Sequence, residues 1–309
     1  MIVLKNVPFL QSRDFSPWPE RITGQEPFHR SARTPEQIQS EYNEGWHKQA
    51  LDKWNEYVES TTTVRPSRFY RSWDNFILES MFATADVYGV SKDEHLISVN
   101  QELFTANWSS VTALYDNLLV DVVERYVDQF GANTLVELGC GSGRNLFKLY
   151  EKVGIQRLVG GDICSNAVTL GKCVSETCSI DGEFQIFDFY ADDCVTRITD
   201  GITDEYLLMT SHAIEQVQVE KTSIVEQILA LPVKPAAVIH FEPLVHKDDT
   251  SFFHRMHRSY TEMNSYNTDL LEVIRQYESQ GAVEVLDCTR SVLGTAAFNP
   301  TSVLVWRCT

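Results

Sequence analysis

The fold of this chain is decided by the stretch Thr134-Leu135-Val136-Glu137-Leu138-Gly139-Cys140-Gly141-Ser142-Gly143. A short apolar run with an acid near its end leads into a turn with glycine at every second position, and residues 144–150 then read as a helix. A second apolar run, at 157–161, is followed by Asp162. Because glycine lacks a Cβ, such a turn bends sharply and lets a ligand approach the backbone closely. The pattern predicts a strand, a tight turn, a helix and a second strand that ends in an acid.

The turn differs from the dinucleotide-binding fingerprint G-x-G-x-x-G, because position 144, where the third glycine would stand, holds Arg. The spacing is G-x-G-x-G, and Glu137 lies two residues before the first glycine. An acid there disfavours a pyrophosphate, so a nucleoside with a positive centre suits the turn better. Asp162 lies where a carboxylate accepts hydrogen bonds from both hydroxyls of a ribose. A purely structural turn without a ligand is the alternative.

Residues 137–143 match the motif E/D-x-G-x-G-x-G in full, and Asp162 matches the acid of a second motif. At these residues the sequence resembles the class I S-adenosylmethionine-dependent methyltransferases, over roughly residues 110–309. The resemblance implies S-adenosyl-L-methionine as cofactor and S-adenosyl-L-homocysteine as product. It also implies a Rossmann-like sheet of seven strands, the last of them antiparallel.

The composition is that of an ordinary globular protein, with 43% hydrophobic and 22% charged residues. The net charge of −17 argues against a nucleic-acid partner, which needs clustered Lys and Arg. We find no apolar run long enough to span a membrane and no secretory signal, so we expect a cytoplasmic protein without a membrane partner. The seven cysteines form no C-x-x-C or Cys/His cluster and read as small buried residues in a reducing compartment. A homodimer is kept as a hypothesis.

From residue 134 onward, predicted strands and helices alternate, which indicates an α/β fold with a mostly parallel, seven-stranded Rossmann-like sheet and helices on both faces. We expect strands at 134–138, 157–161, 183–187, 205–210, 236–241, 283–288 and 302–307. We expect helices near 144–152, 164–178, 217–231 and 260–280.

The first 108 residues hold five of the six tryptophans, so we divide the chain into an aromatic, mostly helical lobe (1–108) and a cofactor-binding domain (109–309). A helix is predicted to start at Thr34, with Gln37 as its capping-box partner, and to run to residue 58. Further helices are predicted at 73–87, 95–108 and 109–130, the last ended by Gly131. The resemblance implies that N-terminal helices cover the cofactor and supply part of the substrate pocket.

Ligands of open parallel sheets bind beyond the carboxyl ends of the strands, so the site residues are sought there. Ile163 is placed to pack against an adenine. The resemblance implies that Asp188 accepts a hydrogen bond from the adenine amine and that the backbone of its neighbour Phe189 also contacts the base. Ser211 follows the fourth strand, and the resemblance implies that this position lies at the entrance to the substrate. The expected cofactor-binding set is Glu137, Gly139, Gly141, Gly143, Asp162, Ile163, Asp188, Phe189 and Ser211.

Methyl transfer to an acceptor with a lone pair requires the loss of a proton, for which a carboxylate or an imidazole is suited. His212 and Glu215 share a helical face if their turn is helical, and Glu242 ends the fifth strand. We take these three as catalytic candidates, although His212 also fits a structural turn and Glu242 a loop cap. Tyr260, Asn264 and Asn267 concentrate hydrogen-bonding groups that could orient a polar substrate. No metal site is expected, because the His and Asp residues at 246–257 match no ligand spacing.

The leading hypothesis is a methyltransferase acting on a small molecule, at a nitrogen of an amine, amino acid or guanidine. The N-P-P-Y/F signature of enzymes that methylate bases and amides is replaced by Ser211-His212-Ala213-Ile214. An O- or C-methyltransferase that uses His212 as base is the alternative among enzymes. A non-catalytic binding or scaffold protein that keeps the fold is the alternative from another class.

Overall fold

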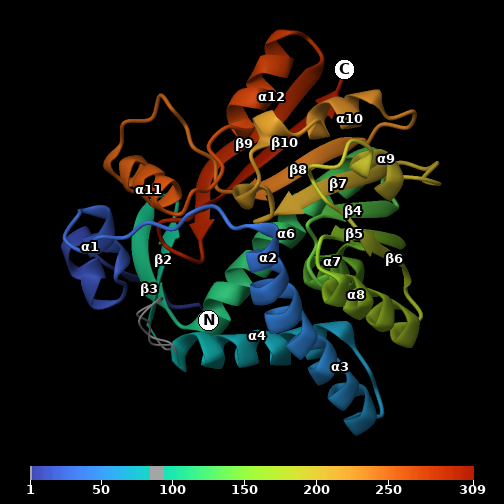
Figure 1. Cartoon of the computed structure of the whole chain (residues 1–309), viewed down its shortest axis with the longest axis horizontal. Helices are drawn as coiled ribbons and strands as arrows, with labels where there is room; N and C mark the ends of the chain where they lie inside the picture. Colours follow the sequence, from blue (N-terminus) through green and yellow to red (C-terminus); the bar gives the residue numbers. More distant parts are fainter. Residues whose placement is uncertain (1, 84–93) are drawn as a thin grey trace.

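The computed structural model describes residues 2–83 and 94–309 and shows a mixed α/β architecture built on one sheet (Figure 1). The ten strands found in this part of the chain lie in the order β1-β3-β2-β9-β10-β8-β7-β4-β5-β6. Their bounds are Lys5–Asn6 (β1), His95–Val99 (β2), Glu102–Ala106 (β3), Thr134–Leu138 (β4), Arg157–Asp162 (β5), Asp181–Ile186 (β6), Tyr206–Ser211 (β7), Ala237–Glu242 (β8), Val283–Gly294 (β9) and Thr301–Cys308 (β10).

Only the half of the sheet formed by β4 to β8 is parallel, and every other pairing is antiparallel. The Rossmann-like core and the antiparallel last strand β10 agree with the prediction. The expected seven-stranded, mostly parallel sheet is wrong, because the strands β1, β3 and β2 extend it beyond β9. The long β9 reaches past its pairing with β10 and hydrogen-bonds β2 at Leu293 and Gly294.

Helices cover both faces of the sheet, because alternate residues of each buried strand point to opposite sides. Leu135 of β4 packs in a core with α6 (Trp108–Phe130), α7 (Arg144–Val153) and α8 (Ser165–Cys178). Val136, the next residue, packs in a second core with α9 (Cys194–Ile198), α10 (Ile224–Ala230) and α12 (Leu270–Ser279). The remaining helices of the body include α11 (Phe252–Met263). None of the helices in the described ranges has the length and apolar character that a membrane crossing needs.

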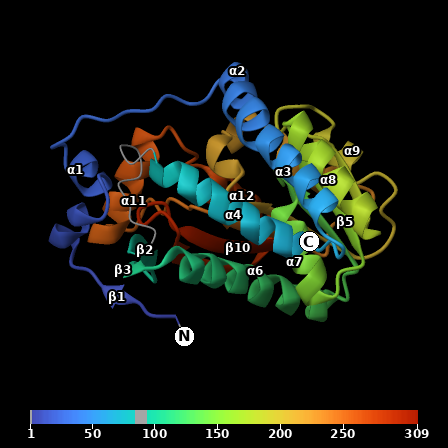
Figure 2. The same ribbon diagram turned by 90° about the horizontal axis from the view of Figure 1, so that it is seen from below.

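The N-terminal helices lie on the face of the sheet that α7 and α8 cover (Figure 2). A continuous helical run consists of α2 (Pro35–Ile38), a π-helix at Gln39–His47 and α3 (Lys48–Ser60), and α4 (Pro66–Ala83) follows. The predicted capping box is confirmed: the backbone N–H of Thr34 donates to Gln37, and that of Gln37 donates to the Thr34 hydroxyl. Shorter elements precede this run, namely a 3-10 helix at Phe9–Asp14 and α1 (Trp18–Ile22). The end of the predicted helix 73–87 lies outside the described residues.

The helix predicted at 95–108 is wrong, because residues 95–106 form the hairpin β2–β3. Asn100 and Gln101 connect its strands with positive φ angles of 47° and 70°. A two-residue turn with two positive φ angles matches the twist of a hairpin. The segment 1–108 is therefore not only helical, and its division from the rest at residue 108 stays a prediction.

Two other helix predictions need shorter bounds. The helix expected at 217–231 is α10 alone, preceded by 3-10 turns, and the one expected at 260–280 is split into α11 and α12. The helix expected at 109–130 is α6, and Gly131, with a φ of 67°, ends it as predicted.

Candidate cofactor and active site

The glycine turn after β4 has a left-handed backbone at Gly139, Gly141 and Gly143, with φ angles of 73°, 53° and 83°. A Cβ at Gly143 would lie 2.8 Å from Phe184, and one at Gly139 would lie 2.4 Å from the Cβ of Ala213. Both the backbone conformation and the packing therefore require glycine at these two positions. The turn holds the start of α7 against the sheet.

Asp162, at the end of β5, joins this turn to the next loop. Its carboxylate accepts hydrogen bonds from the backbone N–H of Gly141 and from that of Cys164, both at 2.8 Å. The parallel register of β4 and β5 brings the two loops to one edge of the sheet. The two acids of the sequence motif thus belong to one site.

Glu137 is 1% exposed, and its Oε1 accepts a hydrogen bond from the Asn145 side chain at 2.8 Å. Its Oε2 has no hydrogen-bond partner among the described residues. Burial raises the pKa of Glu137 to about 8, the Asn145 hydrogen bond opposes the shift, and the charge of Asp162 adds to it. An unpaired buried carboxyl oxygen is costly, so a group that pairs with it would stabilise the site.

The other residues of the expected cofactor set lie on the neighbouring loops. The Ile163 side chain is 41% exposed beside Asp162, so an apolar surface is available there. Phe189 packs edge-to-face on Phe187 and lies 3.4 Å from the position of a Cβ on Gly139. Asp188 accepts a hydrogen bond from the backbone N–H of Tyr190 at 2.9 Å. Phe189 is therefore adjacent to the glycine turn, whereas the adenine role of Asp188 stays a prediction.

The N-terminal helices reach this site with residues that the sequence did not single out. The Nδ2 and Oδ1 of Asn43, in the π-helix, contact Ser165, and Oδ1 accepts the backbone N–H of Asn166 at 2.7 Å, at the start of α8. The ring of His47 lies 3.4 Å from the position of a Cβ on Gly141. Burial lowers the pKa of His47, and the charge of Asp162 opposes this shift. π-Helical segments are frequent at functional sites, and this one presents both side chains to the loops.

Two more helices bind the glycine turn. The hydroxyl of Tyr70, on α4, donates to the carbonyl of Ser142 at 2.5 Å. Arg144, which follows the turn, pairs with Asp74 of α4 at 2.7 Å and with Asp116 of α6 at 3.1 Å. Arg144 stands where the dinucleotide fingerprint has its third glycine. Its ion pairs connect α7, where it lies, to α4 and α6.

His212 lies after β7 with a φ of 50° and contacts an acid and a hydroxyl. Its Nδ1 is 2.9 Å from Glu215 Oε2, and its Nε2 is 2.7 Å from the Thr301 hydroxyl. Burial lowers the pKa of His212, but the hydrogen bond and charge of Glu215 outweigh burial, so the pKa lies above 6.5. Asn299 donates to the same Glu215 oxygen at 2.9 Å. The structure thus brings together His212 and Glu215, as their spacing predicts.

Glu242, the last residue of β8, makes a different set of contacts. Its Oε1 accepts the backbone N–H groups of Ala213 and Ile214, and its Oε2 accepts that of Glu215. Burial raises the pKa of Glu242 to about 7, although the charge of His212 and these hydrogen bonds oppose it. These contacts make Glu242 an anchor for the turn that carries His212 and Glu215.

Ser211 ends β7 beside the same turn. Its hydroxyl is 2.5 Å from the hydroxyl of Tyr115, on α6, and the Tyr115 ring lies 6.1 Å from that of His212. Tyr115 had no signal in the sequence beyond its place on the expected helix 109–130. The contact places the Tyr115 side chain beside the turn that carries the imidazole.

The three expected substrate-binding residues are engaged in the local structure. Tyr260 packs on Trp18 with ring centroids 4.3 Å apart. Asn264 donates to the carbonyl of Tyr260, and the Oδ1 of Asn267 accepts the backbone N–H of Leu270 at the start of α12. Asn267 lies close to the catalytic candidates, since its backbone N–H donates to the Glu215 carbonyl at 2.6 Å. Their substrate role stays a prediction.

One group of three residues in the described ranges places enough ligand atoms together for a metal ion. The ligand atoms of His47, Asp162 and Cys164 lie within 4.8 Å of one another. Both Asp162 oxygens already accept backbone N–H groups. The group lies within the same two loops as the candidate nucleoside site, and we do not assign a metal to it.

No family model and no curated protein matches this chain. Solved structures match parts of the chain at low identity. The Mg-protoporphyrin IX methyltransferase of Synechocystis, solved with bound S-adenosylhomocysteine, is 12% identical over 66% of this chain and 88% of that chain, with a TM-score of 0.45. A bacterial Hen1 methyltransferase domain is 17% identical over 63% and 98%, with a TM-score of 0.42. The pyocyanin biosynthetic protein PhzM is 12% identical over 62% and 55%, with a TM-score of 0.45.

These likenesses are distant, and the identification of the fold rests on the chain itself. The parallel strands β4 to β8, the antiparallel β10 and the glycine turn flanked by Glu137 and Asp162 are the features that the sequence resemblance implies. Together they form a Rossmann-like core, as that resemblance implies.

Proposed function

We propose that this protein is an S-adenosylmethionine-dependent methyltransferase that acts on a small molecule. The observation that carries the proposal is the buried Oε2 of Glu137, which no described residue hydrogen-bonds, beside a glycine turn whose Gly141 N–H lies 2.8 Å from Asp162. A ligand that presents both a cation and a diol fits this pair of acids. The sulfonium nucleoside has both, since its amino-acid part carries an ammonium group.

The residues of the site fit the cofactor. Asp162 would accept hydrogen bonds from the ribose. Glu137, whose pKa burial raises to about 8, would lose its proton when the cofactor binds and would attract the positive part of the cofactor as a carboxylate. Ile163 and Phe189 supply apolar surface for the base. The bound cofactor supplies a methyl group activated by a positively charged sulfur.

His212 is the proposed general base for the methyl acceptor. Glu215 orients the imidazole through Nδ1 and, by raising its pKa, makes it a stronger base. Nε2 would take the proton, so the acceptor must displace the Thr301 hydroxyl that occupies this nitrogen at 2.7 Å. Glu242 is proposed as a positioning residue, because its three backbone contacts hold the turn in place.

A nitrogen acceptor remains our first hypothesis for the atom that is methylated. An oxygen acceptor is the second candidate, and the His212–Glu215 pair favours it, because an imidazole paired with a carboxylate is suited to deprotonating a hydroxyl. The two differ in the products that mass spectrometry would identify after incubation with a metabolite extract.

Calorimetric titration with S-adenosylhomocysteine tests the cofactor assignment. We expect wild-type protein to bind and Asp162→Asn to bind at least tenfold more weakly, since the ribose contacts lose a charged acceptor. Asp128→Asn, an exposed position on α6, removes the same charge outside the site and serves as control. If the wild-type protein gives no heat, the proposal is wrong.

A further inference from the structure

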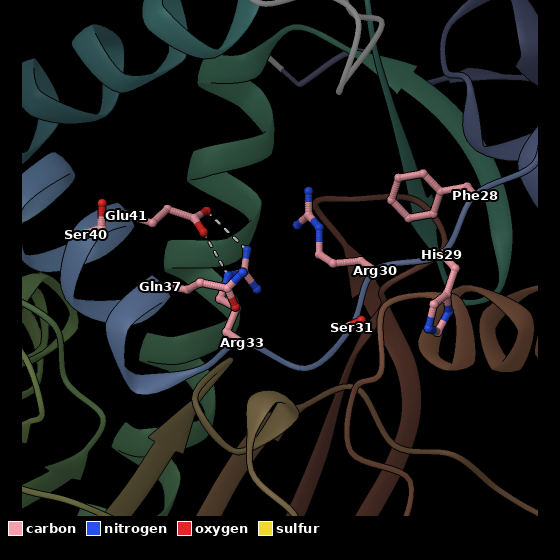
Figure 3. Close-up of a pocket in the computed structure, with 8 residues that line it drawn as sticks. All are labelled: Phe28, His29, Arg30, Ser31, Arg33, Gln37, Ser40 and Glu41. Carbon is pink, nitrogen blue, oxygen red and sulfur yellow. Dashed lines mark hydrogen bonds and ion pairs between the residues drawn. The ribbon is translucent and has the colours of Figure 1, made fainter.

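A cavity of about 530 Å³ lies beside the N-terminal segment that precedes α2 (Figure 3). Its lining extends from this segment through α2 to the start of the π-helix. This volume is within the range of sites for small molecules. Its lining carries many hydrogen-bond donors and two aromatic rings, a phenyl and an imidazole. The lining residues are Phe28, His29, Arg30, Ser31, Arg33, Gln37, Ser40 and Glu41.

The two arginines of the cavity differ in their partners. Arg33 forms a two-pronged ion pair with Glu41, at 2.9 and 3.2 Å. Arg30 has no ion-pair or side-chain hydrogen-bond partner among the described residues, and Figure 3 shows its guanidinium projecting into the open space. The positive charge of Arg33 and the negative charge of Glu41 cancel. Among the described lining residues, the charge of Arg30 therefore stays uncompensated, in a protein whose net charge is −17.

The backbone of Arg30 is hydrogen-bonded on both sides, although its side chain has no ion-pair or hydrogen-bond partner in residues 2–83 and 94–309. Its N–H donates to the Met263 carbonyl at 2.7 Å, and its carbonyl accepts from the Ser265 hydroxyl at 2.9 Å. The segment is therefore fixed against the end of α11. The fold therefore fixes the Cα of Arg30 at the cavity, and no salt bridge with a described residue holds its guanidinium elsewhere.

The cavity borders the turn that carries the catalytic candidates. Arg33 donates to the side chain of Gln216 at 3.4 Å, and Gln216 directly follows Glu215. Gln216 also donates to the Tyr42 hydroxyl, in the π-helix next to the cavity wall. A molecule in the cavity would therefore lie on the side of the His212–Glu215 pair that the N-terminal segment covers.

We propose that this cavity binds the carboxylate of a small organic acid and that Arg30 is its specificity-determining residue. A guanidinium fork pairs with a carboxylate through two parallel hydrogen bonds. A single uncompensated charge matches a monoanion, whereas a phosphate dianion would leave one charge without a partner. The identification of this acid as the methyl acceptor rests on the proposed function. The selection of a carboxylate by the cavity is independent of the proposed function.

Ligand-observed fluorine NMR on the full chain, without cofactor, tests the selectivity directly. The probes are 4-fluorobenzoate, the neutral 4-fluorobenzamide and the dianionic 4-fluorophenyl phosphate. We expect the benzoate to bind more tightly than the other two. Arg30→Gln should weaken its binding at least tenfold, and Arg30→Lys should give an intermediate loss, because a lysine keeps the charge without the fork.

Arg13→Gln is the matched control, because it removes an exposed arginine of the same N-terminal segment outside the cavity. It should bind the benzoate like the wild type, and thermal unfolding should show that all three variants fold. Equal binding of benzoate and benzamide, tighter binding of the phosphate, or unchanged benzoate binding by folded Arg30→Gln would each overturn the proposal. Because the assay needs no cofactor, its failure is distinct from a failure to bind S-adenosylhomocysteine.

Discussion

The replacement Glu137→Gln tests the electrostatics of the proposed cofactor site. Burial raises the pKa of Glu137 from 4.5 to about 8, so the folded protein holds a proton there that the unfolded chain releases above pH 4.5. Folded protein then binds more protons than unfolded protein, and this residue's contribution to stability falls as the pH rises from 4.5 to 8. One pKa unit corresponds to about 1.4 kcal/mol, so above pH 8 the buried carboxylate lowers the free energy of unfolding of the wild type by up to about 5 kcal/mol.

Glutamine has the shape of the protonated acid and can still accept the Asn145 hydrogen bond, but it does not titrate. We therefore expect Glu137→Gln to gain stability relative to the wild type as the pH rises, with little difference at pH 4.5 and the full difference above pH 8. Urea unfolding of both proteins at pH 5, 7 and 9 gives this difference directly.

Glu124→Gln, at an exposed position on α6, removes one carboxylate without burial and is the control. Its effect should stay within about 0.5 kcal/mol at each pH. Glu137→Gln should also bind S-adenosylmethionine more weakly than the wild type at pH 9, where the wild type presents a carboxylate and the control Glu124→Gln keeps it. A stability difference between Glu137→Gln and wild type that does not change between pH 5 and 9 would refute the reasoning.

Three further changes are tested by unfolding and by turnover. Gly143→Ala should lose about 1–3 kcal/mol more than Gly154→Ala, because both glycines have a φ near 80° but only Gly143 would place a Cβ within 3 Å of Phe184; equal losses in urea unfolding would contradict this. His212→Ala should lower the formation of S-adenosylhomocysteine from S-adenosylmethionine and the acceptor about 100-fold, while cofactor binding is kept. Turnover by the wild type should fall as the pH drops through a value above 6.5, because the imidazole is then protonated. Full turnover by the variant would exclude His212 as the general base. Asn43→Ala should cost about 1 kcal/mol, because the start of α8 loses a side-chain acceptor, and unchanged thermal stability would disprove that role.

The local features of the chain were predictable from the sequence. The strand, glycine turn and second acid at 134–162 lie as expected, because each depends on short-range backbone chemistry and on a buried apolar run. The capping box at Thr34 and the stop at Gly131 are confirmed for the same reason. The pairing of His212 with Glu215 is also local, since the two residues are three apart.

The hairpin at 95–106 was missed because its turn uses Asn100 and Gln101 without a glycine, and because its partner strand β9 lies almost two hundred residues later. The extension of the sheet to ten strands follows from that long-range pairing. Helical periodicity cannot show such a partner, and only tertiary contacts decide between a short helix and an edge hairpin.

The sequence by itself determined the Rossmann-like core and the acids of its glycine turn, because these obey spacing rules that operate over a few residues. Tertiary structure alone decided which distant residues reach that turn: His47 and Tyr70 come from helices far upstream. It also decided that the oxygens of Glu242 accept hydrogen bonds from backbone N–H groups, and that Arg30 projects into a cavity where no described residue pairs with its side chain. Burial and pairing depend on which segments meet in space, and that information is spread over the whole chain.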